Sequence, residues 1–305
     1  MKQQHHKKQS ECTGQNGYSL VELLVVIVIS LIITGAIYSS YISQQRSFTA
    51  QDQVTELNST SRISLNIIAN DLRETGFGLL ENGAFNINGF TQVLTLTDNA
   101  SAPDQITLIG AFRKAGTLCS NGNGNAISPD DTTLRLVPPE GSEGLDNINT
   151  TDKRNISIAG IRYGIVTSGG GAEFRIQLQD RVGESFPLYT DLNANGNCDD
   201  GEGVPVYLIE DYTYRVVGNE LQRVRRLNDP DPDIDIIAQN IEDLQFALVN
   251  SNTVRVNILA STARPDPNFQ GLGNPPQTIE NRNLPATNDA LRRRWWQMEV
   301  AVRNL

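Results

Sequence analysis

The residues with the clearest chemical pattern form an acidic, asparagine-rich loop at 191–202. Its sequence is Asp-Leu-Asn-Ala-Asn-Gly-Asn-Cys-Asp-Asp-Gly-Glu, which fills every required position of the calcium-binding loop D-x-[DN]-x-[DN]-G-x5-E. Oxygen ligands at this spacing favour Ca²⁺ over Mg²⁺, because Ca²⁺ accepts more ligands in a more flexible geometry. The expected ligands are the side chains of Asp191, Asn193, Asn195, Asp199 (directly or through water) and Glu202, and the backbone carbonyl of Asn197.

This loop departs from a paired EF-hand in two respects. Cys198 stands where a paired EF-hand usually has an apolar residue, and the flanks 186–190 and 204–209 have the composition of strands rather than helices. We therefore predict an isolated EF-hand-like loop. Only three of its ligands are acidic, which indicates a modest affinity suited to extracellular calcium. The alternative is an acidic Asn/Gly turn that binds no metal.

Other reactive side chains are few. The only histidines are His5 and His6 near the N-terminus, so a histidine-dependent triad or zinc site is excluded from the rest of the chain. No glycine-rich phosphate loop follows a predicted strand, and we do not expect an enzyme. If the body is exported to an oxidising compartment, Cys119 and Cys198 are expected to form a disulfide that tethers the calcium loop. Two unconnected thiols are the alternative.

A lone carboxylate, Glu22, is the only charge in the apolar segment 18–42. A helix of this length reaches about 37 Å and can cross a hydrocarbon core of about 30 Å. A single charge in such a segment is costly unless it is paired. No small-residue cleavage site follows the segment, as it would in a secretory signal. Lys7 and Lys8 indicate a cytoplasmic N-terminus, so we expect one inner-membrane span with the rest exported.

The helical pattern continues beyond the apolar segment as an amphipathic stripe. Apolar or small residues recur every three or four positions, and no proline occurs between residues 18 and 76. One helix is therefore predicted through both halves, ended by Gly76 and Gly78, with its second half packed on a globular body. The stripe consists of Val54, Leu57, Ser61, Leu65, Ile68 and Leu72.

Short β-branched runs separated by Asn-, Gly- and Pro-rich loops fill the chain after residue 78 and predict a mostly antiparallel β body, hence an α+β fold. The expected strands are 91–97, 105–111, 132–137, 156–166, 173–179, 204–209, 212–217, 220–226, 244–249, 253–260 and 297–303, with a long insertion at 264–289.

The net charge of −10 makes nucleic acid an improbable partner. The run 292–296, Arg-Arg-Arg-Trp-Trp, is the one basic and aromatic patch. One interpretation is that this patch contacts DNA, a phosphate or a membrane. The other is that it starts a strand whose tryptophans are packed and whose arginines pair with acids. We favour the second interpretation. Arg223, Arg225 and Arg226 are expected on one solvated strand face.

The junction Gly17-Tyr18-Ser19-Leu20-Val21-Glu22-Leu23-Leu24 resembles the class III signal of type IV prepilins and pseudopilins. The resemblance implies cleavage between Gly17 and Tyr18 by a prepilin peptidase, which also methylates the new N-terminus. It further implies that Glu22, the fifth residue of the mature chain, meets the α-amino group of a neighbouring subunit during assembly. Tyr18 stands where phenylalanine is commoner.

Residues 62–78 are similar to the second half of the helix in PilW-type minor pilins, with Asp-Leu-Arg and a Gly-aromatic ending, and the end of the chain at 300–304 fits as well. The resemblance covers about residues 14–78 and is weak over the β body. It implies a leader (1–17), a membrane and assembly half-helix (18–42), an amphipathic half-helix (43–78) and a β-rich pilin body (79–305).

By this resemblance the chain is a minor pilin that helps to initiate pilus assembly or lies at the pilus tip. Its partners are then other major and minor pilins and the prepilin peptidase, and it moves from the inner membrane to the periplasm and the extracellular pilus. Two alternatives remain. One is a pseudopilin of type II secretion, similar to pseudopilin J. The other is a tip module that binds DNA, a surface or an extracellular partner through its long loops.

Overall fold

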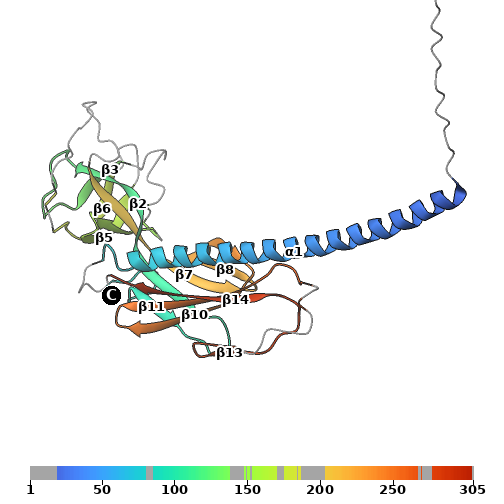
Figure 1. The fold of residues 1–305 in the computed structure, drawn as a ribbon. Coiled ribbons are helices and arrows are strands. Elements are labelled where there is room, and N and C mark those ends of the chain that lie inside the picture. The colour runs from blue at the N-terminus through green and yellow to red at the C-terminus, as the bar shows by residue number, and fades with distance from the viewer. Residues whose placement is uncertain are drawn as a thin grey trace, which may run out of the picture. The chain divides into compact units, whose positions relative to one another are not determined.

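The structure is a computed structural model that describes residues 19–79, 85–137, 148, 150–151, 153–169, 175–183, 185–186, 203–266, 269 and 277–303. The chain divides into two compact units, Met1–Asp52 and Gln53–Leu305. One continuous helix, α1 (Leu20–Glu74), begins in the first unit and ends in the second (Figure 1).

A side-chain cap marks the start of α1, and two glycines mark its end. At its start the Ser19 hydroxyl accepts a hydrogen bond of 3.2 Å from the backbone N–H of Glu22, the usual N-cap bond of a Ser-x-x-Glu sequence. At its end the chain turns at Gly76 and Gly78, which have left-handed φ values of 78° and 81°. The predicted long helix that ends at these glycines is confirmed.

The remainder of the described chain is built from β-strands whose pairings are all antiparallel, which confirms the α+β fold with a mostly antiparallel body. In chain order the strands are β1 (Leu94–Thr97), β2 (Gln105–Asn121), β3 (Thr133–Val137), β4 (Asn155–Ile158), β5 (Arg162–Gly169), β6 (Arg175–Leu178), β7 (Val204–Val217), β8 (Glu220–Arg225), β9 (Asp233–Gln239), β10 (Ile241–Asn250), β11 (Thr253–Ser261), β12 (Gln277–Ile279), β13 (Arg282–Leu284) and β14 (Arg293–Ala301).

Two long strands, β2 and β7, belong to two sheet regions at once. They pair from Ile106↔Tyr214 to Leu118↔Val204, with irregularities in the register at Gly110–Arg113 and Lys114–Gly116. At one end they continue into the order β1-β2-β7-β8-β9. At the other, β3, β6, β5 and β4 connect β2 back to β7, so that six strands close into a small barrel (Figure 1). Bulges allow one strand to bend from one region into the other.

Each region has its own apolar core. The barrel encloses side chains such as Leu134, Ile156 and Val206. The second core joins the apolar face of α1 to β2, β7 and β8 and to a three-stranded sheet of order β10-β11-β14. The predicted stripe accounts for this face, because Leu57, Ser61, Leu65, Ile68 and Leu72 are all buried. The amphipathic half of the helix is thus the element on which this core is assembled.

Several strand predictions were wrong in their bounds. The expected strand 156–166 is two strands, because the chain turns at Ala159 and Gly160, whose φ values are 58° and 74°. The two runs 204–209 and 212–217 form the single strand β7. Strand β9 was missed. The insertion 264–289 contains the hairpin of β12 and β13, which turns at Glu280 with a φ of 51°.

Candidate assembly surface on the N-terminal helix

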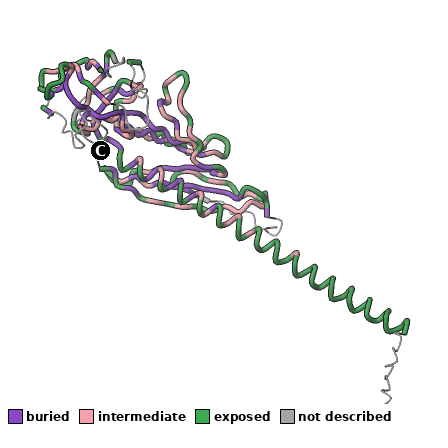
Figure 2. The backbone as a smooth tube through the Cα atoms, turned by 90° about the horizontal axis from the view of Figure 1, so that it is seen from above, coloured by how far each residue is buried: buried purple, intermediate pink, exposed green. Residues whose placement is uncertain are grey.

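The N-terminal part of α1, from Leu20 to about residue 50, exposes nearly all of its apolar side chains (Figure 2). Leu20 is 79% exposed and Leu31 is 67% exposed. The most apolar window of this helix has a mean hydropathy of 2.8, and its length and composition are sufficient to cross a membrane. An apolar surface of this extent is unstable in water and requires lipid or another protein around it.

Glu22 lies in the first turn of this apolar helix. Its backbone N–H is held by Ser19, whereas its carboxylate has no ion pair or hydrogen bond with any residue that the structure describes. The partial positive charge of a helix N-terminus favours a carboxylate here but does not neutralise it. In apolar surroundings a carboxylate without a partner is costly. The two predicted processing residues, Gly17 and Tyr18, lie outside the described residues.

The basic patch at the start of β14 agrees only in part with its strand interpretation: two of its arginines pair with acids, but Trp295 is 46% exposed rather than packed. The Arg292 guanidinium lies 2.7 Å from the buried carboxylate of Asp266, and Arg293 lies 2.6 Å from Asp289. Arg294 stacks over the ring of Trp296, with 5.4 Å between the guanidinium carbon and the ring centroid. Arg292 and Arg293 therefore serve internal ion pairs rather than an open anion-binding surface.

The prediction for Arg223, Arg225 and Arg226 was wrong, because these side chains are partly or fully buried. Arg223 pairs with Asp71 of α1 at 3.3 Å and with Asp235 at 2.9 Å, and Arg226 is 5% exposed. The acids on β9 that pair with these arginines, Asp233 and Asp235, come from the strand that sequence reasoning missed. The cluster fixes β8 to β9 and to the helix.

The predicted calcium ligands, Asp191, Asn193, Asn195, Asn197, Asp199 and Glu202, all lie outside the described residues. Within the described ranges no group of three acidic, histidine or cysteine side chains is placed to hold a metal. Cys119 lies in β2 and takes part in a disulfide. The other two cysteines, Cys12 and Cys198, are outside the described chain, so the pairing with Cys198 stays a prediction.

Residues 12–38 match the protein family described as the prokaryotic N-terminal methylation motif. This match contains Gly17, Tyr18, Glu22 and the start of the exposed apolar helix. No curated protein and no solved structure matches the chain. The motif and the fold together support a type IV pilin-like or pseudopilin-like subunit that is processed by a prepilin peptidase, anchored in a membrane before assembly, and assembled with other pilins.

Proposed function

We propose that this chain is a minor pilin of a type IV pilus, related to the PilW type, and that it helps to initiate assembly or forms a tip or minor component of the filament. One observation carries the proposal. Inside the methylation motif, an exposed apolar half-helix carries a single carboxylate, Glu22, that has no partner among the described residues. The pattern of residues 62–78, which covers the helix end and its glycine turn, favours the PilW type.

The proposed assembly step transfers the apolar half of α1 from lipid to the core of a filament. The transfer is feasible because neighbouring apolar helices replace lipid around the same side chains. After cleavage between Gly17 and Tyr18, the α-amino group of a neighbouring mature subunit is the proposed partner of the Glu22 carboxylate. Pairing these opposite charges removes the penalty of burying either one alone, and it fixes the axial register of the two helices.

Mass spectrometry of the mature N-terminus tests the processing step. We expect a chain that begins at N-methylated Tyr18. A chain that keeps residues 1–17 in cells with an active prepilin peptidase would contradict the proposal. The pseudopilin alternative is separated by immunoblotting sheared surface fibres and by assaying type II secretion in a deletion strain. Loss of secretion with intact pili would assign the chain to the secretion system instead.

We also propose that the loop 191–202 binds Ca²⁺ and stiffens the body outside the cytoplasm. The support is the ligand pattern of the sequence. Isothermal titration of the full chain with CaCl₂ is expected to give one site per chain, which Asp191→Ala abolishes. Asp52→Ala, which changes an exposed acid on α1, serves as the matched control and is expected to bind normally. Absence of binding by the unmodified chain would refute the site.

A further inference from the structure

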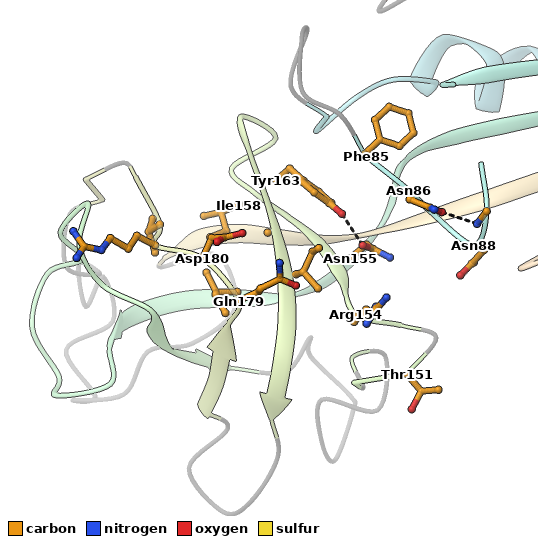
Figure 3. A pocket seen from close by; sticks show the side chains of 16 residues that line it. Phe85, Asn86, Asn88, Thr151, Arg154, Asn155, Ile158, Tyr163, Gln179 and Asp180 are labelled. Atoms are coloured by element: carbon orange, nitrogen blue, oxygen red, sulfur yellow. Dashed lines mark hydrogen bonds between the residues drawn. The ribbon is translucent and has the colours of Figure 1, made fainter. Parts of the chain in front are cut away.

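A polar pocket of about 590 Å³ lies in the second unit, outside the surface used for assembly. Its lining comes from β4, β5, the residues that follow β6, and the turn at 85–89 (Figure 3). The volume lies within the usual range of small-molecule sites. The proposed assembly of the minor pilin does not use this pocket.

One wall of the pocket is a rigid two-residue turn. Ile87 and Phe90 exchange backbone hydrogen bonds of 3.0 and 2.9 Å around Asn88 and Gly89, which both have left-handed φ values. The Asn88 amide donates a 2.6 Å hydrogen bond to Asp211, a fully buried residue of β7. These bonds hold the wall in place without a ligand, so little conformational entropy is lost on binding.

The most buried polar residue of the lining is Asn155, which is only 5% exposed. Its Oδ1 accepts a 2.8 Å hydrogen bond from the Tyr163 hydroxyl (Figure 3). Its amide nitrogen has no acceptor among the described residues. Burial raises the pKa of Tyr163, which keeps the hydroxyl protonated and the bond intact. The Asn155 amide nitrogen is not one of the buried polar atoms that lack a partner, so it is open to the solvent of the pocket and can donate to a ligand in place of water.

The charges around the pocket cancel. Arg154 and Asp180 lie apart across the pocket, and neither forms an ion pair with a described residue (Figure 3). The third charged residue, Arg181, is paired with Asp130 at 2.5 Å. Phosphate and other multiply charged anions normally require several converging cations, which this lining does not provide. The balance of charge therefore favours a neutral ligand.

The remaining lining combines amides with aromatic rings. The side chains of Asn86, Asn155 and Gln179 present donors and acceptors, and Phe85 and Tyr163 present ring surfaces. Amides match vicinal hydroxyls, because each of the two groups both donates and accepts. Aromatic faces pack against the C–H face of a sugar ring. We propose that this pocket binds a neutral saccharide unit, with Asn155 as the buried recognition residue.

Saturation-transfer NMR on the full chain tests this proposal, with lactose, cellobiose and chitobiose as probes. The protein is kept in an amine-oxide detergent, because a maltoside headgroup would compete for the pocket. At least one disaccharide is expected to receive saturation. Gln179→Ala is expected to weaken its binding about three- to tenfold, the effect of losing one hydrogen bond. Tyr163→Phe is expected to weaken it to a similar extent, because Asn155 loses the hydroxyl that orients its amide. Asn155→Ala is expected to abolish the signal.

Asn66→Ala is the matched control, because Asn66 is exposed on α1 and remote from the pocket lining. It is expected to bind like the unmodified chain. Thermal unfolding of every variant checks its fold; if Asn155→Ala unfolds, the exposed Gln179→Ala decides the test. Saturation of none of the three sugars, equal saturation in Gln179→Ala, or a response only to anionic glucuronate would each overturn the proposal. None of these outcomes affects the methylation of Tyr18, so the minor-pilin proposal is judged separately.

Discussion

The hydroxyl of Tyr214 donates a hydrogen bond of 2.5 Å to Oδ2 of Asp71. Tyr214 lies in the last third of β7 and is fully buried, and Asp71 lies one turn before the end of α1. The Arg223 guanidinium approaches the same oxygen at 3.3 Å. Burial raises the pKa of Asp71, and the contacts with Tyr214 and Arg223 act against that rise. This polar contact lies in a largely apolar interface and fixes how the helix meets the sheet.

Asp71→Ala is expected to destabilise the body by about 1–3 kcal/mol, because the buried Tyr214 hydroxyl is left without its acceptor. Urea unfolding followed by the fluorescence of Trp295 and Trp296 measures the change. Asn66→Ala on the exposed face of the same helix should shift the transition little. Equal effects of the two substitutions would mean that the Tyr214–Asp71 bond contributes nothing to stability.

The sequence predicts α1 and its apolar stripe because both depend on local spacing, but it cannot predict a partner 143 residues away from Asp71. The helical spacing did indicate that Asp71 needs a polar partner, because it lies three residues after Ile68 on the buried face of the helix. Strand β9 was missed because its pattern is inverted. Its acids face the buried arginines, while Ile234 and Ile236 are 47% and 55% exposed.

The candidate sites differ in the same way: one is local in the sequence, and the other is formed by residues that are distant in the sequence. Glu22 and the apolar half-helix are consecutive in the chain, so composition and order are enough to predict an assembly surface. The saccharide pocket gathers Asn86, Asn155 and Gln179 from three separate segments. Its lining contains no sequence motif, because the residues are brought together only when β4, β5 and β6 close the barrel.

Asp104 is expected to make the stability of the body depend on pH. Asp104 is 1% exposed, and this burial raises its pKa. Backbone hydrogen bonds from Phe246 and Asn99 lower the pKa, and the nearby carboxylates of Asp98 and Asp243 raise it further. The folded state therefore binds this proton more tightly than the unfolded state does. The stabilisation is full below the unfolded pKa of about 3.9 and is lost as the pH rises through the folded pKa.

The free energy of unfolding of the unmodified chain, minus that of Asp104→Asn, is therefore expected to fall as the pH rises from about 4 to 7. Urea titrations at intervals across this range measure the difference. The variant does not titrate at position 104, so the subtraction removes the contributions of the other acids. A difference that grows with pH would show that the pKa of Asp104 is lowered in the folded state.

Gly78 is expected to tolerate no side chain. Its φ is 81°, and a Cβ there would lie 2.7 Å from Cβ of Ser157 and 2.8 Å from Cβ of Ala111. Gly124 has a similar φ of 83°, but a Cβ there would meet nothing within 4 Å. Gly78→Ala should thus destabilise the body by about 1–3 kcal/mol more than Gly124→Ala, because only the first adds overpacking to the backbone strain. Differential thermal unfolding of the two variants measures this margin, and equal shifts would argue against close packing at Gly78.

Glu22→Ala tests the proposed pairing between subunits. An unpaired α-amino group in apolar surroundings costs roughly 3–5 kcal/mol, so we expect at least about a tenfold loss of the subunit from sheared pili. Immunoblots of the pilus and membrane fractions measure the distribution, and the variant subunit should accumulate in the membrane. Glu56→Ala removes an exposed glutamate from the second half of the same helix and should assemble normally.

A defect in Glu22→Ala arises from the carboxylate rather than from the helix cap, because the cap uses the backbone N–H of residue 22, which alanine retains. Ser19→Ala makes the converse change: it removes the cap oxygen, at a cost of about 1 kcal/mol to the helix, and keeps the carboxylate. If the charge pair directs assembly, Ser19→Ala subunits reach the pilus and Glu22→Ala subunits do not. The reverse order would mean that the start of the helix matters and the carboxylate does not.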